Sequence, residues 1–260
     1  MESKILIVGY GTVGQNLYRE ISVLNPDVYD KYKEIIIQDH RNCNDRDTEQ
    51  KYDFAFICVD TPFSTQSNGL DTAEVVRAIH DNLADIYVIK STCPVGFTET
   101  LARFNHKHIV ISPEYYGATP HCNNFEFNFT ILGGVKEDCI KVQQVLQECY
   151  DARHVFRITD SNTAEMVKLM ENSWLATKVT FCNQFYELAE KYDVSYEELR
   201  ELFLLDPRVN PSHTFVYRDH PYWDSHCLNK DVRHLASSGA EFLESVVKFN
   251  QHQKDKYSGS

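Results

Sequence analysis

Cys227 raises the first chemical question of this sequence, because it stands in the stretch DSHCLNKD, just before Lys230 and Asp231. A cysteine in such a place is a small apolar filler, a metal ligand or a nucleophile. None of the eight cysteines forms a CxxC pair or flanks a zinc-type histidine spacing, so we expect no metal site. A thiolate is accessible near neutral pH, and the charge of Lys230 favours it. We therefore predict that Cys227 is a nucleophile, and we interpret four others as apolar filler: Cys58, Cys139, Cys149 and Cys182.

Lys168 and Asn172 form a second candidate pair, because they are four residues apart in a helical pattern and share one face. A lysine and an amide that project together can stabilise an oxyanion as charge develops. Glu165 lies three residues before Lys168, so the alternative is a solvated Glu–Lys pair on an exposed face. The surrounding apolar residues favour a mostly buried helix instead: Met166, Val167, Leu169, Met170 and Trp174.

Glu114 is a third candidate, because it follows a predicted strand and a proline. Ligands of parallel α/β sheets bind beyond the carboxyl ends of the strands. A carboxylate at this position is therefore expected to face a substrate.

A cofactor motif lies at the start of the chain, where Gly9, Gly11 and Gly14 form a GxGxxG run between a predicted strand and a predicted helix. These glycines permit a tight turn, close approach of a pyrophosphate and close helix packing, and the helix start binds phosphate oxygens. Asp39 follows about 25 residues later and is expected to hold the adenosine ribose, which favours NAD over NADP. Arg41 tempers that preference, since an arginine can accept a 2′-phosphate. The alternative is a glycine-rich turn without a ligand.

The elements that position these residues alternate between strand and helix in the first half of the chain. This alternation predicts a Rossmann-type, doubly wound parallel sheet, an α/β fold, over residues 1–155. The predicted strands are 4–9, 34–39, 53–59, 86–91, 108–113 and 129–134, and the predicted helices are 12–24, 71–84, 97–104 and 136–149.

The second half of the chain predicts an all-helical domain over residues 156–250, followed by a polar, frayed tail over 251–260. A long helix over 162–192 contains neither glycine nor proline. Such a helix forms the spine of a helical domain or a dimer interface, and we expect a homodimer through it. Further helices are predicted over 195–205 and 230–250, with an irregular segment over 206–227 that includes Cys227.

Composition narrows the class of protein further. The 260 residues carry a net charge of −12, which argues against nucleic acid as a partner. No signal peptide and no apolar run long enough to cross a bilayer is present, so we expect no membrane association. Eight cysteines without a pairing pattern indicate reduced thiols and a cytoplasmic protein.

Six segments occur in a recognisable order: 59–62 (VDTP), 90–96 (KSTCPVG), 112–114 (SPE), 131–134 (ILGG), 164–172 (AEMVKLMEN) and 227–231 (CLNKD). In this order they resemble the UDP-glucose/GDP-mannose dehydrogenase family over residues 1 to about 240. The resemblance implies an NAD-dependent oxidoreductase of the UDP-glucose 6-dehydrogenase kind. Such an enzyme oxidises the primary alcohol of a UDP-hexose to a uronate in two hydride transfers.

The resemblance also implies roles for single residues. Cys227 adds to the aldehyde, and its thiohemiacetal gives a second hydride and a thioester. Lys168 and Asn172 stabilise the oxyanion, with Asp231 in the same proton network, and Glu114 activates the water that cleaves the thioester. Thr92 orders that water or the nicotinamide, and Arg208 reaches a neighbouring subunit's substrate site. The substrate is held by Glu114, Lys168, Asn172 and Arg208, and NAD by Gly9, Gly11, Thr12, Val13, Gly14, Asp39, Arg41, Val59, Thr61, Pro62, Thr92 and Lys230.

The sequence departs from the family at three points, which keep other interpretations open. Residues 222–226 (YWDSH) replace a glycine-rich loop, Ala118 replaces a second acidic residue, and we expect the family's third, UDP-binding domain to be absent. The substrate is therefore a nucleotide sugar or a smaller sugar. The alternatives are a two-electron enzyme like the 3-hydroxyacid dehydrogenases, which should survive Cys227→Ser, and a non-catalytic NAD-binding remnant.

Overall fold

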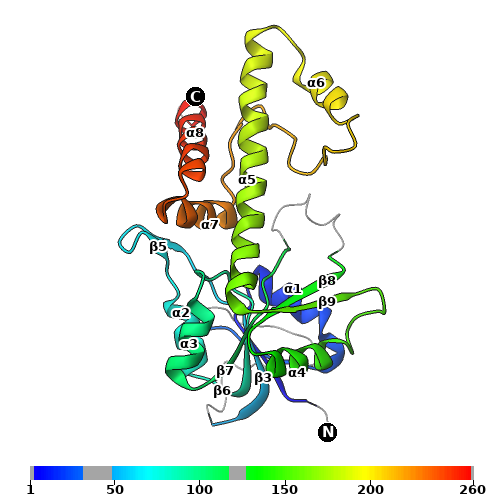
Figure 1. Cartoon of the computed structure of the whole chain (residues 1–260), viewed down its shortest axis with the longest axis vertical. Helices are drawn as coiled ribbons and strands as arrows, with labels where there is room; N and C mark the ends of the chain where they lie inside the picture. Colours follow the sequence, from blue (N-terminus) through cyan, green and yellow to red (C-terminus); the bar gives the residue numbers. More distant parts are fainter. Residues whose placement is uncertain (1–2, 32–48, 117–126, 259–260) are drawn as a thin grey trace. The chain divides into compact units, whose positions relative to one another are not determined.

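The computed structural model describes residues 3–31, 49–116 and 127–258. The chain divides into two compact units (Figure 1). The first contains residues 1–62 and 71–168, and the second contains residues 63–70 and 169–260. Asp39, Arg41, Ala118 and the strand predicted over 34–39 lie outside the described residues.

Within the described ranges, the first unit is built on a seven-stranded sheet with the order β2-β1-β3-β6-β7-β8-β9. The strands are β1 (Ile5–Val8), β2 (Asp27–Tyr29), β3 (Lys51–Ile57), β6 (Leu83–Ile89), β7 (His108–Ile111), β8 (Phe129–Gly133) and β9 (Val155–Thr159). The chain leaves β1 for β2 on one side and returns to β3 on the other, so the end of β1 is a topological switch point, where ligands of such sheets bind.

Four helices cover the two faces of this sheet (Figure 1). Helices α1 (Thr12–Glu20) and α4 (Lys136–Leu146) bury Leu17 and Val142 on one face. Helices α2 (Ala73–His80) and α3 (Phe97–Asn105) bury Val75 and Leu101 on the other. A short 3₁₀ helix, η1 (Ser22–Leu24), follows α1. The predicted α/β Rossmann fold is confirmed.

Three details of the sheet differ from the sequence prediction. The pair β7·β8 is antiparallel, because a parallel return needs a long crossover and no helical pattern lies between these strands in the sequence. Strands β2 and β9 were missed, since β2 has only three residues and Arg157 interrupts the apolar pattern of β9.

The second unit is helical, as predicted, but its last part is divided differently. It contains most of α5 (Ser161–Lys191), together with α6 (Tyr196–Phe203), α7 (His226–Ser237) and α8 (Glu241–Tyr257). The single helix predicted over 230–250 is wrong, because the chain breaks at Gly239, whose φ of +94° suits glycine. The predicted frayed tail is also wrong up to Tyr257, where α8 ends.

Helices α6, α7 and α8 pack at different levels of α5 (Figure 1). Leu228 and Val232 of α7 and Val246 of α8 form a core with Ala176, and Tyr196 of α6 packs against Tyr186 and Ala189. A hairpin of β4 (Phe63–Ser64) and β5 (Gly69–Leu70) joins this unit. Ser237 Oγ donates a hydrogen bond of 2.8 Å to the Asn68 carbonyl of the hairpin.

Candidate active site

The glycine motif forms a tight turn between β1 and α1. Gly9 has a φ of +94°, and a Cβ there would lie 2.6 Å from the Cys58 carbonyl oxygen. A Cβ at Gly14 would lie 2.0 Å from the Gly9 carbonyl oxygen, so the helix packs directly on the turn. A Cβ at Gly11 would meet no atom within 4 Å. The open space over Gly11, at the start of α1, fits a pyrophosphate that approaches the backbone, with Thr12 and Val13 in the first helical turn.

Asp30 is a further acidic candidate for the adenosine ribose, at the end of β2, while Asp39 lies outside the described residues. Asp30 follows β2 directly, and its Oδ2 accepts a 2.7 Å hydrogen bond from the Tyr10 amide inside the glycine motif. An acidic residue at this point is the usual ligand of the adenosine ribose. The spacing in the sequence could have indicated Asp30. It lies 16 residues after Gly14, which is closer to the usual interval of about 20 residues than the position of Asp39 is.

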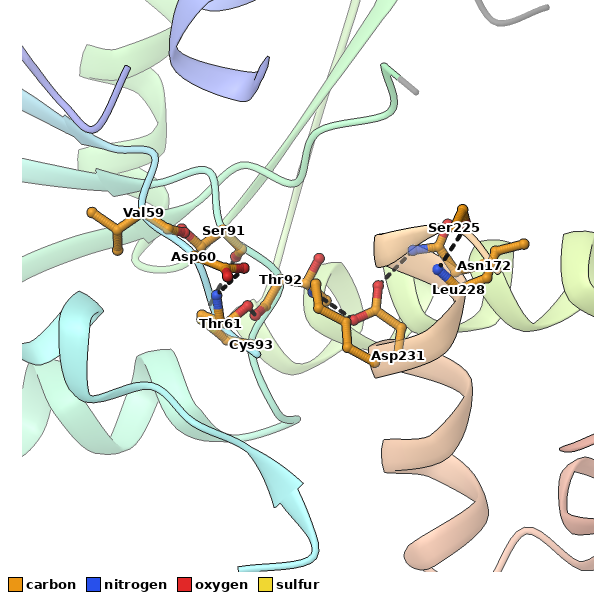
Figure 2. Close-up of polar contacts among 11 residues, drawn as sticks. Val59, Asp60, Thr61, Ser91, Thr92, Cys93, Asn172, Ser225, Leu228 and Asp231 are labelled. Atoms are coloured by element: carbon orange, nitrogen blue, oxygen red, sulfur yellow. Dashed lines mark hydrogen bonds and ion pairs between the residues drawn. The ribbon is translucent and has the colours of Figure 1, made fainter. Parts of the chain in front are cut away.

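The loops after β3 and β6 are tied together by buried hydroxyl groups (Figure 2). Thr61 Oγ1 donates to the Thr92 carbonyl at 2.8 Å, and Ser91 Oγ donates to the Val59 carbonyl at 2.6 Å. Thr61 and Ser91 are buried, whereas Thr92 and Val59 are half-buried and Pro62 is exposed. These bonds fix the backbone that carries Thr92 beyond the carboxyl end of the sheet.

Glu114 is held at the end of β7 by a lysine that the sequence analysis did not single out. Lys90 Nζ lies 3.3 Å from Glu114 Oε2, and each side chain is only 9% exposed. Glu114 Oε1 also accepts hydrogen bonds from the Tyr115 and Tyr116 amides, at 2.8 and 3.2 Å. The carboxylate is therefore fixed by three donors, and Lys90 supplies the opposite charge that burial of a carboxylate requires.

Lys168 is buried, as the functional interpretation requires, and its Nζ lies 4.8 Å from the centre of the Tyr115 ring. The alternative of a solvated Glu165–Lys168 pair is wrong. Glu165 accepts hydrogen bonds from the Gly96 and Thr98 amides, at 2.6 and 2.9 Å, and so it caps α3. Burial raises the pKa of Glu165.

Three predicted residues of the second unit meet where α7 crosses α5 (Figure 2). Asn172 Nδ2 donates to Asp231 Oδ2 at 2.5 Å, and Lys230 Nζ donates to Asp231 Oδ1 at 2.7 Å. Asn172, Lys230 and Asp231 are all buried. Asp231 thus accepts from an amide and an ammonium, which neutralise its charge in the interior.

Cys227 lies in the first turn of α7, not in an irregular loop as predicted. Ser225 caps this helix by accepting a hydrogen bond from the Leu228 amide. Of the six cysteines in the described part of the chain, Cys227 is the exposed one. A helix N-terminus carries partial positive charge, which stabilises a thiolate. The filler interpretation holds for Cys58, Cys139 and Cys182, which are buried, while Cys149 is half-buried.

Two further predictions concern Arg208 and the apolar residues of α5. Arg208 follows α6, and its guanidinium donates to the Asp206 carboxylate from Nε at 3.0 and 3.1 Å and from Nη2 at 2.6 Å. The prediction that the apolar residues around Lys168 and Asn172 are buried is right for Leu169 and wrong for the other four. Met166, Val167, Met170 and Trp174 are exposed, Met170 and Trp174 by more than 60%.

Among the described residues, no group of three or more His, Cys, Asp or Glu side chains could hold a metal ion. No helix in the described ranges is long and apolar enough to span a bilayer.

The fold defines a class: a dinucleotide-binding domain of the Rossmann type joined to a helical unit built on one long helix. Residues 162–252 match the family model described as the UDP-glucose/GDP-mannose dehydrogenase family, central domain. The chain is similar to this family in its central domain, as its six ordered segments predicted.

Two curated relatives illustrate the match. The chain is 28% identical over 256 residues to a UDP-N-acetyl-D-mannosamine dehydrogenase of Pyrococcus horikoshii, covering 90% of this chain and 60% of the relative. It is 27% identical over 280 residues to a UDP-glucose 6-dehydrogenase of Campylobacter jejuni, covering 94% and 70%. The solved structure of a UDP-D-ManNAc dehydrogenase from Pyrococcus horikoshii shares the fold, with a TM-score of 0.82, 24% identity and coverage of 98% and 70%. The chain thus spans about two thirds of the length of such relatives.

Proposed function

We propose that this protein is an NAD-dependent nucleotide-sugar dehydrogenase, which oxidises the primary alcohol of a UDP-hexose to a uronate in two hydride transfers through Cys227. One observation carries the proposal: the single exposed thiol of the described chain stands at a helix N-terminus, one turn from the buried Asn172–Asp231–Lys230 cluster. A structural cysteine needs neither exposure nor such neighbours.

The NAD assignment rests on the glycine turn and on Asp30. Gly11 leaves room for the pyrophosphate, and the α1 N-terminus supplies amide donors. Asp30 offers a carboxylate to the ribose hydroxyls, which favours NAD over a 2′-phosphorylated cofactor. When bound, NAD accepts the hydride that leaves the sugar carbon. Thr61, Pro62, Val59 and Thr92 supply the neighbouring loops, and Lys230 stays a predicted cofactor contact.

The residues of the helical unit carry the covalent chemistry. The alcohol loses a proton and a hydride and becomes an aldehyde, and the thiolate of Cys227 adds to its carbon. Lys168 and Asn172 stabilise the oxyanion of that adduct, and Asp231 orients Asn172 by accepting its amide hydrogen. Loss of a second hydride from the thiohemiacetal carbon gives a thioester on Cys227.

Hydrolysis of the thioester is assigned to Glu114, with Thr92 ordering the water. The carboxylate takes a proton from the water as the water oxygen bonds to the acyl carbon. The carbon–sulfur bond breaks, its electron pair returns to Cys227 and a uronate leaves. Lys90 holds the Glu114 carboxylate in place in the interior, so the base is positioned before the substrate arrives.

We further propose a homodimer that is formed through α5. Four large apolar side chains recur at helical spacing on its exposed side, and they are Met170, Trp174, Phe181 and Phe185. Phe203 of α6 extends this surface, with its ring 6.5 Å from that of Phe181. An exposed apolar patch of this kind is typical of a protein interface. Arg208, exposed after α6, is then available to the partner's substrate.

The names of the relatives guide the choice of substrate: both act on UDP-linked sugars. We therefore expect a UDP-hexose such as UDP-glucose or UDP-N-acetyl-D-mannosamine. We keep the cytoplasm as the proposed location, because the eight cysteines show no pairing pattern in the sequence. A two-electron 3-hydroxyacid dehydrogenase remains the second candidate, because a Rossmann domain and a Lys–Asn pair one helical turn apart also suit that reaction.

NADH stoichiometry tests the proposal. The purified protein is incubated with NAD and limiting UDP-glucose or UDP-N-acetyl-D-mannosamine, and NADH is counted at completion. Two NADH per sugar are expected, and Cys227→Ser should stall at the aldehyde. One NADH with the wild type, and full activity of Cys227→Ser, would favour the two-electron enzyme. NAD binding without any NADH would indicate a non-catalytic protein.

A further inference from the structure

A small cavity lies behind Glu114, within the first unit. Its walls include Lys90, Glu114, Glu20, Thr130, Tyr150 and His154. Its volume is about 20 Å³, which is enough for one water molecule when several polar groups surround it. The cavity therefore joins the proposed base of the hydrolysis to a second group of polar side chains.

Glu20 is a second carboxylate in the wall of this cavity. It is the last residue of α1, it is half-buried, and its Oε2 accepts a 2.6 Å hydrogen bond from the Tyr150 hydroxyl. The side chain of Tyr116, two residues after Glu114, is also hydrogen-bonded to Glu20. Burial and the negative charge of Glu20 raise the pKa of Tyr150, so the phenol stays protonated and donates. Glu20 thus links the interior to solvent through a carboxylate.

The neighbouring groups fix this arrangement without competing for the proton. The Tyr150 and His154 rings stack with centres 3.9 Å apart, and His154 Nε2 shares a 2.8 Å hydrogen bond with Thr130 Oγ1. Burial lowers the pKa of His154, which keeps the imidazole neutral at physiological pH. The carboxylate of Glu20 is therefore the group beyond the cavity that can receive a proton.

We propose that the cavity holds a water molecule, and that this water and Glu20, positioned by Tyr150, carry the proton away from Glu114 after each hydrolysis. The inference rests on the proposed function, because it needs the thioester step. In that step Glu114 gains one proton from the attacking water and must lose it before the next turnover. The proton passes from Glu114 to the cavity water, which gives one of its own protons to Glu20, and Glu20 releases it to solvent.

Burst kinetics of Glu20→Gln and Tyr150→Phe test this inference. Both changes keep the shape of the side chain. The substrate is whichever of UDP-glucose and UDP-N-acetyl-D-mannosamine gives NADH with the wild type. Both hydride transfers precede hydrolysis, so each variant should keep a burst of two NADH per Cys227. The linear phase that follows should slow at least about tenfold. This is a smaller loss than the removal of a positioned acid–base group causes. A high concentration of imidazole buffer should restore the linear rate of Glu20→Gln, because a mobile base then replaces the carboxylate.

Each other outcome decides against the inference. A linear phase at the wild-type rate in both variants would overturn it while leaving the proposed function intact. Loss of burst and linear phase together, without rescue by buffer, would assign Glu20 and Tyr150 a structural role only. A wild-type protein that forms no NADH with either sugar would overturn the proposed function and this inference with it. Glu148→Gln, an exposed carboxylate close to Tyr150 in sequence, is the matched control and should behave as wild type.

Discussion

Gly11 and Gly14 provide a matched pair of substitutions that separates cofactor binding from folding. In Gly11→Ala the added methyl group meets no protein atom within 4 Å, and the φ of −73° suits alanine. Such a change stabilises a fold by about 0.4–1 kcal/mol, because it restricts the unfolded chain. In Gly14→Ala the methyl group would lie 2.0 Å from the Gly9 carbonyl oxygen, and overpacking of this kind costs about 3 kcal/mol or more.

For Gly11→Ala, the effect on NAD binding should be opposite in sign to the effect on stability. If the pyrophosphate lies over Gly11, the methyl group of Gly11→Ala occupies its place, and we expect NAD to bind at least about tenfold more weakly, a loss of about 1.4 kcal/mol. At an NAD concentration about 100 times the wild-type Kd, NAD stabilises the wild type by about 2.7 kcal/mol. The same concentration should stabilise Gly11→Ala by about 1.4 kcal/mol.

Titration calorimetry with NAD and thermal unfolding with and without NAD measure both quantities on the same samples. We expect Gly11→Ala to unfold at or slightly above the wild-type Tm without NAD, and to gain less from NAD. Gly14→Ala should unfold at a lower temperature even without NAD. Wild-type NAD affinity in Gly11→Ala would refute the reasoning, because it would show that the dinucleotide does not pass over this turn.

Four further predictions concern the proposed catalytic residues and the helical unit. Lys168→Ala should lower turnover at least about a hundredfold in NADH assays, the scale of losing an oxyanion stabiliser, and near-normal turnover would remove Lys168 from the mechanism. Asp231→Ala removes the carboxylate beside the buried Lys230 and should lower the free energy of unfolding in urea by about 3–5 kcal/mol. The control Asp224→Ala breaks an exposed pair with Lys254 and should lower it by less than about 1 kcal/mol. Equal losses in the two variants would contradict the argument. Trp174→Glu places a charge in the exposed stripe of α5 and should convert the dimer to a monomer in sedimentation experiments, whereas an unchanged dimer would place the interface elsewhere. Burial lowers the pKa of His234 below its ordinary 6.5, so below that pH the unfolded chain binds more protons than the folded chain, and stability should fall as the solution is acidified. His234→Gln should flatten this pH dependence of the free energy of unfolding. An unchanged slope would exclude His234 as its source.

The elements that carry the site could be read from the sequence because their patterns are local. The glycine motif between a strand and a helix has a steric signature within six residues, and the 31-residue α5 lacks both residues that interrupt helices. The pairing of Asn172 with Asp231 was not visible in the same way. The resemblance placed both residues in the site, but their hydrogen bond depends on how α7 crosses α5.

The residues that sequence reasoning missed act through tertiary contacts. Asp30 follows a strand of only three residues, too short to give a periodic pattern. Lys90 begins the segment 90–96 (KSTCPVG), but its role depends on the 3.3 Å contact with Glu114, 24 positions away. Glu165 was interpreted as a helix-face residue, and its two amide partners lie nearly 70 positions earlier. No local pattern encodes such distances.

The most direct test of the central claim is mass spectrometry of the Glu114→Gln variant after reaction with NAD and the UDP-sugar. Without the carboxylate that activates water, the thioester should accumulate. The account predicts a peptide that contains Cys227 and carries the mass of the oxidised sugar nucleotide, formed together with two NADH per site. Two NADH and free product without any adduct on Cys227, or an adduct on a different cysteine, would contradict it.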